Sequence, residues 1–258
     1  MITTPISRYQ VLSPRSALTF LGLACLGLVS VGEIAQAQIV QYTISNGTGT
    51  STSLSATTTD PGVNVSSLTS AGSLTTSGSQ ITVPGTFTFG TWGAGASPDT
   101  TKYIDFSITP TAGNQVAYST ISFAVGARMN VAHGADLWDL QYSLDGFGTA
   151  GTQLGSTITV SLAGSGFRGN TTLVNNLDIS AIGTQTGTVT FRLFGYDDTS
   201  AGSHVAGLVG TGNANLGGGQ ELTVNGTVSA VPEPSSYAAV FGALAFGFVF
   251  ITRRLRKA

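Results

Sequence analysis

Along residues 81–230, apolar side chains alternate with polar ones in several short runs. A period of two puts every second side chain on the same face of a strand, and one apolar face per strand is typical of an antiparallel sheet. Each run is bounded by Gly, Pro, Asn or Asp, which favour turns. The alternating apolar positions are Phe87, Phe89, Ile104, Phe106, Ile108, Ile121, Phe123, Val125, Trp138, Leu140, Tyr142, Leu144, Ile158, Val160, Leu162, Val189, Phe191, Leu193, Leu222 and Val224.

At least seven strands with one buried face, and no helical period between them, predict an all-β domain over residues 81–230. We expect an antiparallel β-sandwich of jelly-roll type. Residues 38–80 differ, because twenty of these 43 residues are Ser or Thr. That segment is either a Ser/Thr-rich leader or a set of marginal first strands.

The N-terminal residues 1–37 have the pattern of a signal peptide. Arg8 and Arg15 precede an apolar stretch from Ala17 to Gly32, and Ala35 and Ala37 are small residues at the two positions that signal peptidase reads. We therefore expect cleavage after Ala37. A first transmembrane helix is the alternative, but the apolar stretch is short for that.

Cys25, the only cysteine of the chain, lies inside this predicted signal peptide. A lipidated Cys25 is disfavoured, because Gly22 stands where a lipobox normally has Leu. If the signal peptide is removed, the mature chain has no thiol, so neither a disulfide nor a cysteine metal site stabilises it.

Charge and composition narrow the class of protein further. Residues 38–231 contain four basic residues against ten acidic ones, a net charge near −6. So few cations exclude a nucleic-acid-binding surface. Abundant Gly, Ser and Thr together with β-branched residues suit an extracellular β-protein whose surface is neutral and hydroxylated.

The C-terminal residues 231–258 combine three features in order. Pro232, Glu233 and Pro234 come first, and the two prolines favour an extended, accessible backbone. An apolar run from Ala238 to Ile251 follows, for which we expect a single transmembrane helix, although residues 235–252 are just short of the usual length. The basic tail comes last and places the C-terminus in the cytoplasm; its cations are Arg253, Arg254, Arg256 and Lys257.

This order of elements resembles the PEP-CTERM sorting signal of Gram-negative bacteria. The resemblance implies recognition by an exosortase, a membrane-embedded enzyme that removes the tail near Glu233 and passes the protein to the cell exterior. An ordinary single-span anchor is the alternative. The resemblance further implies association with exopolysaccharide and biofilm matrix.

The middle of the chain is similar to a β-sandwich domain common among PEP-CTERM substrates. The segments that carry this similarity are residues 103–106, 138–147, 189–196 and 222–226. Relatives often have Asp-Asn before the last strand, whereas Gln220 and Glu221 stand here, so no site is carried over to that region.

Candidate chemistry in the chain is sparse. His133 and His204 lie in Gly-rich segments, and no HExxH pattern, GxSxG elbow or EF-hand loop occurs, so we predict no enzyme activity and no transition-metal site. Structural calcium is the one cofactor that the loops could hold, and its candidate ligands are Asp136, Asp139, Asp197 and Asp198. Their spacing does not match an ordered calcium loop, and strand alternation or turn formation explains them equally well.

Trp92 is the candidate for stacking on a sugar ring. Trp138 and Tyr142 share a face with Leu140 and Leu144, which predicts core packing, whereas Trp92 lies in a Gly-rich segment, residues 90–95.

The sequence as a whole therefore predicts an exported, exosortase-processed protein of the cell surface or exopolysaccharide matrix, with a structural or adhesive role. A carbohydrate-binding module is the alternative. A glycan hydrolase is less favoured, because it needs paired carboxylates at a suitable separation. Signal peptidase, exosortase, the membrane and extracellular polysaccharide are the expected partners.

Overall fold

The fold is taken from a computed structural model of the chain, in which the described residues are 37–48, 50–71, 74–75, 84–128, 134–161, 171–197, 205–211, 218–232 and 234–256. The predicted signal peptide lies outside these ranges except for Ala37.

The described strands form two sheets in which every strand pairing is antiparallel, so the prediction of an all-β fold is confirmed. The first sheet has the order β3 (Thr58–Thr59), β1 (Ala37–Tyr42), β15 (Leu222–Ala230), β8 (Asn114–Arg128), β14 (Val205–Val209) and β6 (Thr86–Phe89), with β11 (Thr171–Asp178) and β12 (Thr184–Gln185) also paired to β8. The second has the order β10 (Thr152–Thr159), β9 (Leu137–Ser143), β13 (Val189–Tyr196), β7 (Ile104–Pro110), β5 (Leu68–Ser70) and β2 (Ser53–Leu54), with β4 (Val63–Val65) paired to β7. Within the described ranges, two short 3-10 helices, η1 (Ile44–Asn46) and η2 (Ser180–Ile182), connect strands.

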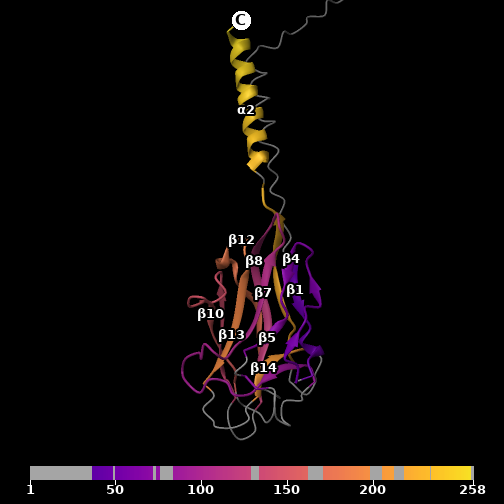
Figure 1. Cartoon of the computed structure of the whole chain (residues 1–258), viewed down its shortest axis with the longest axis vertical. Helices are drawn as coiled ribbons and strands as arrows, with labels where there is room; N and C mark the ends of the chain where they lie inside the picture. The colour runs from indigo at the N-terminus through magenta and orange to yellow at the C-terminus, as the bar shows by residue number, and fades with distance from the viewer. Residues whose placement is uncertain are drawn as a thin grey trace, which may run out of the picture. The chain divides into compact units, whose positions relative to one another are not determined.

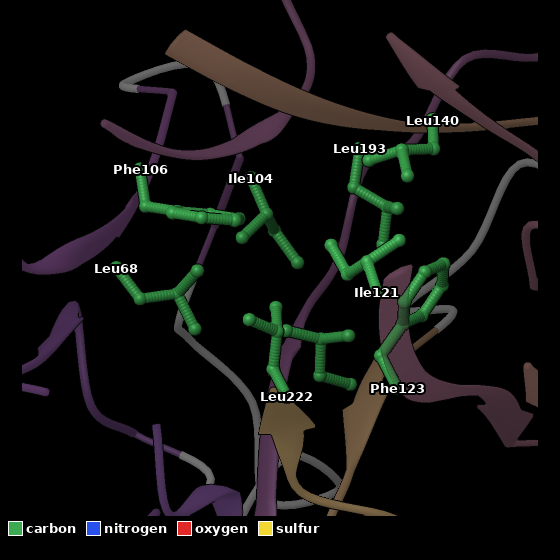
Figure 2. A pocket seen from close by; sticks show the side chains of 9 residues that line it. Leu68, Ile104, Phe106, Ile121, Phe123, Leu140, Leu193 and Leu222 are labelled. Atoms are coloured by element: carbon green, nitrogen blue, oxygen red, sulfur yellow. The ribbon is translucent and has the colours of Figure 1, made fainter. Parts of the chain in front are cut away.

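The two sheets pack face to face, and their apolar side chains meet in one core. Figure 2 shows side chains of both sheets pointing toward one another around a cavity of about 10 Å³. Nine apolar side chains line this cavity: Leu68, Ile104, Phe106, Leu140 and Leu193 from the second sheet, and Ile121, Phe123, Leu208 and Leu222 from the first. The space is apolar and barely the size of one water molecule, so we expect it to be dry.

Residues 37–70 contribute short strands to both sheets. β1 lies between β15 and β3, and its first residue, Ala37, pairs with Gly226 of β15. Glu221, which directly precedes β15, connects that strand to residues 37–70. Its carboxylate accepts hydrogen bonds from the backbone and hydroxyl groups of Ser45 and Thr211. Glu221 thus has a structural role here.

On one side of the sandwich, the end strands β10 and β11 are both interrupted by bulges. The bulge of β10 contains Gly155, with φ +71°, and that of β11 contains Asn176, with φ +50°. A Cβ atom on Gly155 would lie 2.7 Å from Cδ1 of Leu177, and Thr172 Oγ1 donates to the Thr159 carbonyl at 2.9 Å. The two bulged strands therefore contact each other and cover the side of the core.

At the C-terminus, the chain leaves β15 and forms one helix, α2 (Pro234–Leu255), drawn in yellow in Figure 1. Its uninterrupted apolar run, residues 238–251, covers about 21 Å at 1.5 Å per residue, against a hydrocarbon core about 30 Å thick. Among the residues that the structure describes, no helix has both the length and the apolar character needed to cross a membrane, so the expected C-terminal span is not found.

Candidate functional site

The candidate site is the turn that joins β9 to β10, residues 144–151. Gly146 and Phe147 both have positive φ, +68° and +64°, which lets the chain reverse direction within a few residues. Asp145 followed by Gly146 is a favoured turn pair, so the local sequence accounts for the position of the reversal.

Asp145 organises this turn through its carboxylate. Ser143 Oγ donates to Asp145 Oδ1, while the backbone N–H and the hydroxyl of Thr149 donate to Oδ2 at 3.0 and 2.7 Å. The Ser143 hydroxyl in turn accepts from the backbone N–H groups of Asp145 and Phe147. These hydrogen bonds, that of Ser143 above all, hold the pKa of the Asp145 carboxyl below its usual range.

Beside this carboxylate lies an open hollow of about 250 Å³, which we call the hairpin hollow. It combines one phenol ring, two apolar side chains, three aliphatic hydroxyl groups and one carboxylate. Its lining residues are Tyr142, Ser143, Leu144, Asp145, Thr149, Ala150 and Thr152.

Leu144 is 55% exposed at this hollow, so the prediction that it shares the buried face of Trp138 and Leu140 is wrong. The physical reason is that β9 ends at Ser143, and the turn carries Leu144 away from the core. Tyr142, one alternation earlier, packs partly against the core and partly borders the hollow.

The other side of the turn is fixed to the sheet by a stacked arginine. The guanidinium of Arg192, on β13, lies 3.8 Å from the ring centre of Tyr103 and 4.2 Å from that of Phe147. Arg192 also pairs with Asp105 at 3.8 Å, and Asp105 accepts from Thr69 Oγ1 at 2.7 Å. This cation–π packing limits the movement of Phe147 and so holds the turn in one position.

Trp92 is not available for sugar stacking in this structure, contrary to the sequence-based expectation. The side chain is only 2% exposed, and its Nε1 donates to the carbonyls of Phe89 and Ala206 at 2.9 and 3.1 Å. Its ring meets that of Trp138 edge-on, with 4.8 Å between centres. The Gly-rich segment folds over the end of the core, and the large ring fills the space beneath it.

The calcium candidates are used in other ways where the structure describes them. Asp139 is 5% exposed and accepts from Gln153 Nε2 at 3.2 Å and Thr157 Oγ1 at 2.8 Å. The carbonyl of Asp136 accepts from the backbone of Val160, and Asp197, which follows β13 with φ +62°, donates its backbone N–H to the Gly95 carbonyl. Within the described ranges, no three metal-ligating side chains come together. Asp198, His133 and His204 lie outside those ranges.

The residues of the predicted sorting signal are only partly described. Pro232 is exposed after the last strand, and Pro234 is the first residue of α2. Arg253, Arg254 and Arg256 are exposed near the end of that helix. Glu233, Lys257 and Ala35 lie outside the described residues, whereas Ala37 begins β1.

The hairpin hollow was missed by reasoning from the sequence, although its signal is present. The turn pair Asp145–Gly146 directly follows Leu144 in the sequence. This position indicates that the strand ends before Leu144 and that its apolar side chain is exposed beside the turn.

Comparison with protein-family models gives no match, and comparison with curated proteins gives none either.

Proposed function

We propose that this chain is exported, sorted by an exosortase through its C-terminal residues, and released to the cell surface or exopolysaccharide matrix, where it has a structural or adhesive rather than enzymatic role. The sandwich, of jelly-roll type, is the part that remains. The tail retains the chain at the inner membrane until it is removed.

The observation that carries this proposal is the order of elements after β15. The backbone N–H of Val231 donates to the Gly113 carbonyl of the sandwich at 2.8 Å, and exposed Pro232 comes directly after it. The helix that follows has large apolar side chains exposed and Arg253 and Arg254 in its last turn. An accessible extended segment, an apolar helix and a cationic end are what recognition at a membrane surface would require.

A glycan-binding module is the second candidate function, and the hairpin hollow favours it. The hairpin hollow, rather than Trp92, is the candidate sugar-binding position, because the hollow is open to solvent whereas Trp92 is buried. A binding module and a matrix component are compatible, since adhesion to polysaccharide is one form of structural role.

The test is the intact mass of the protein recovered from culture supernatant and from the membrane fraction, in strains with and without the exosortase. We expect a supernatant species that begins at Gln38 and ends between Pro232 and Pro234, and that is lost when the enzyme is absent. A single membrane species that still ends at Ala258 in both strains would overturn the proposal.

Substitutions in the tail give matched controls for this experiment. Glu233→Ala, or replacement of the four terminal cations by Gln, should leave the protein in the membrane fraction. Replacement of Arg253, Arg254 and Arg256 by Lys keeps the charge and should allow normal release, because the positive charge rather than the guanidinium orients the tail. Equal release of the Gln variant would show that the cations have no role in sorting.

A further inference from the structure

We propose that the hairpin hollow binds one neutral pyranose unit of a polysaccharide. That this polysaccharide belongs to the extracellular matrix rests on the proposed function above. The binding itself follows from the residues that line the hollow.

The size and the opening of the hollow suit a single sugar ring. Pockets for drug-sized ligands occupy about 300–1,000 Å³, so the hollow of about 250 Å³ fits a smaller molecule. Because it is open to solvent, one ring can enter while the neighbouring units of a polymer continue outside.

The lining has the mixed polarity of a pyranose, which carries hydroxyl groups around its rim and C–H groups on its faces. Tyr142 and Leu144 provide an apolar surface for a C–H face. Exposure of more than half of Leu144 leaves apolar area in contact with water, and a sugar face would cover it. The hydroxyls of Thr149 and Thr152 lie beside this surface, where sugar hydroxyls need partners.

Asp145 supplies a fixed acceptor for a sugar hydroxyl. Ionised carboxylates have about four lone-pair sites, and the turn uses one hydrogen bond on Oδ1 and two on Oδ2. Oδ1 therefore keeps acceptor capacity, while the turn holds the group in place. A charged acceptor that is positioned in advance makes a stronger hydrogen bond and loses less entropy on binding.

The charge of the hollow selects against acidic sugars. Asp145 is its one charged lining residue, and the guanidinium of Arg192 is stacked on the rings of Tyr103 and Phe147 and does not line the hollow. A uronate or sulfate group would meet this carboxylate, with no cation among the described lining residues to compensate. The ligand class is therefore neutral.

The test is native affinity electrophoresis of the full chain in mild detergent, in gels containing dextran, galactomannan or xylan, with alginate as the acidic comparison. We expect at least one neutral polysaccharide to retard the protein, its own monosaccharide to compete, and EDTA to have no effect. Alginate should not retard it.

Two substitutions in the hollow have matched controls elsewhere on the surface. Leu144→Ser and Asp145→Asn should each weaken the apparent affinity by about tenfold, the effect of losing one well-placed contact. Leu173→Ser and Asp178→Asn should leave it unchanged, because Leu173 is similarly exposed at 49% and Asp178 likewise accepts from its own turn, both on β11. Thermal unfolding of all four variants shows whether each remains folded.

Several results would overturn the inference: no retardation by any of the three neutral polysaccharides, equal weakening by the β11 controls, retardation by alginate alone, or retardation that EDTA abolishes. Failure of this inference and failure of the proposed function are distinguishable. If the chain binds sugar but is never processed, only the sorting proposal is contradicted. If the chain is processed but does not bind neutral sugars, only the proposed sugar binding by the hairpin hollow is contradicted.

Discussion

Leu222 and Leu144 are the same side chain in opposite surroundings. Leu222 is buried between the sheets beside the small core cavity, whereas Leu144 is mostly exposed. Truncation of a buried leucine removes its packing and enlarges a cavity, which typically costs about 2–5 kcal/mol, whereas an exposed site changes stability by about 0.5 kcal/mol or less. Leu222→Ala should therefore lower the free energy of unfolding by several times more than Leu144→Ala, measured by urea denaturation. Similar losses at both sites would place Leu144 in the core after all.

Acid should destabilise the domain through three aspartates whose pKa values are lowered. The causes are hydrogen bonds to Asp99 from Thr101, to Asp145 from Ser143 and Thr149, and to Asp178 from Ser180. Because each folded-state pKa is below the unfolded-state value, the stabilisation is complete above the unfolded pKa and is lost as pH falls through the folded pKa. We expect the free energy of unfolding to fall below about pH 4.

The corresponding triple variant provides the control for this pH dependence. With Asp99, Asp145 and Asp178 all replaced by Asn, the slope of stability against pH below about pH 4 should become shallower. An unchanged slope would assign acid sensitivity to other carboxyl groups.

Single residues also show where reasoning from the sequence stops. The alternating pattern correctly placed Trp138 and Leu140 in the core, because a period of two fixes the face. It could not place Trp92, since its burial depends on Phe89 and Ala206, residues brought together only by the folded sheets. The alternating pattern also did not indicate whether Leu144 belongs to the strand that contains Trp138 and Leu140 or to the turn that follows.

Among the elements, the facing bulges of β10 and β11 offer a direct test of close packing. Gly155 and Gly146 have nearly equal positive φ, +71° and +68°, but only a Cβ on Gly155 would meet another atom, Leu177 Cδ1. Both alanine variants should lose about 1–2 kcal/mol from backbone strain. Gly155→Ala should lose a further 1–3 kcal/mol or so from overpacking. Thermal unfolding of the two variants compares them, and equal losses would mean that Leu177 simply moves aside.

Strands whose residues alternate between apolar and polar were predictable, whereas β14 and β11, which lack this alternation, were not. Six of the seven predicted runs correspond to β6, β7, β8, β9, β13 and β15. The seventh run, Ile158, Val160 and Leu162, overlaps β10 only at Ile158, because Val160 follows that strand and Leu162 lies outside the described residues. β14 was missed because Val205–Val209 is apolar throughout and buried throughout, so no period is visible. β11 was missed for the opposite reason: it is an end strand with no fully buried position, and its bulge interrupts the alternation.

For the whole molecule, the proposed release requires that the sandwich remain folded without its tail. A chain that ends at Pro232 keeps β15 complete and should unfold within about 2–4 °C of the full chain, the shift produced by about 1 kcal/mol in a domain of this size. A chain that ends at Gln220 lacks β15, the strand between β1 and β8, and should not unfold cooperatively. Calorimetry distinguishes these outcomes, and a large loss on removal of the tail alone would argue against processing.

The pairing of β1 with β15 also determines when the first sheet can be completed during synthesis. β1 precedes every other described strand in the chain and β15 follows them all, so only the two-residue β3 can pair with β1 earlier. Contacts between such distant residues form slowly. The first sheet therefore cannot be completed until residues 222–230 have been synthesised. If the chain is exported as proposed above, it crosses the membrane before this sheet is complete.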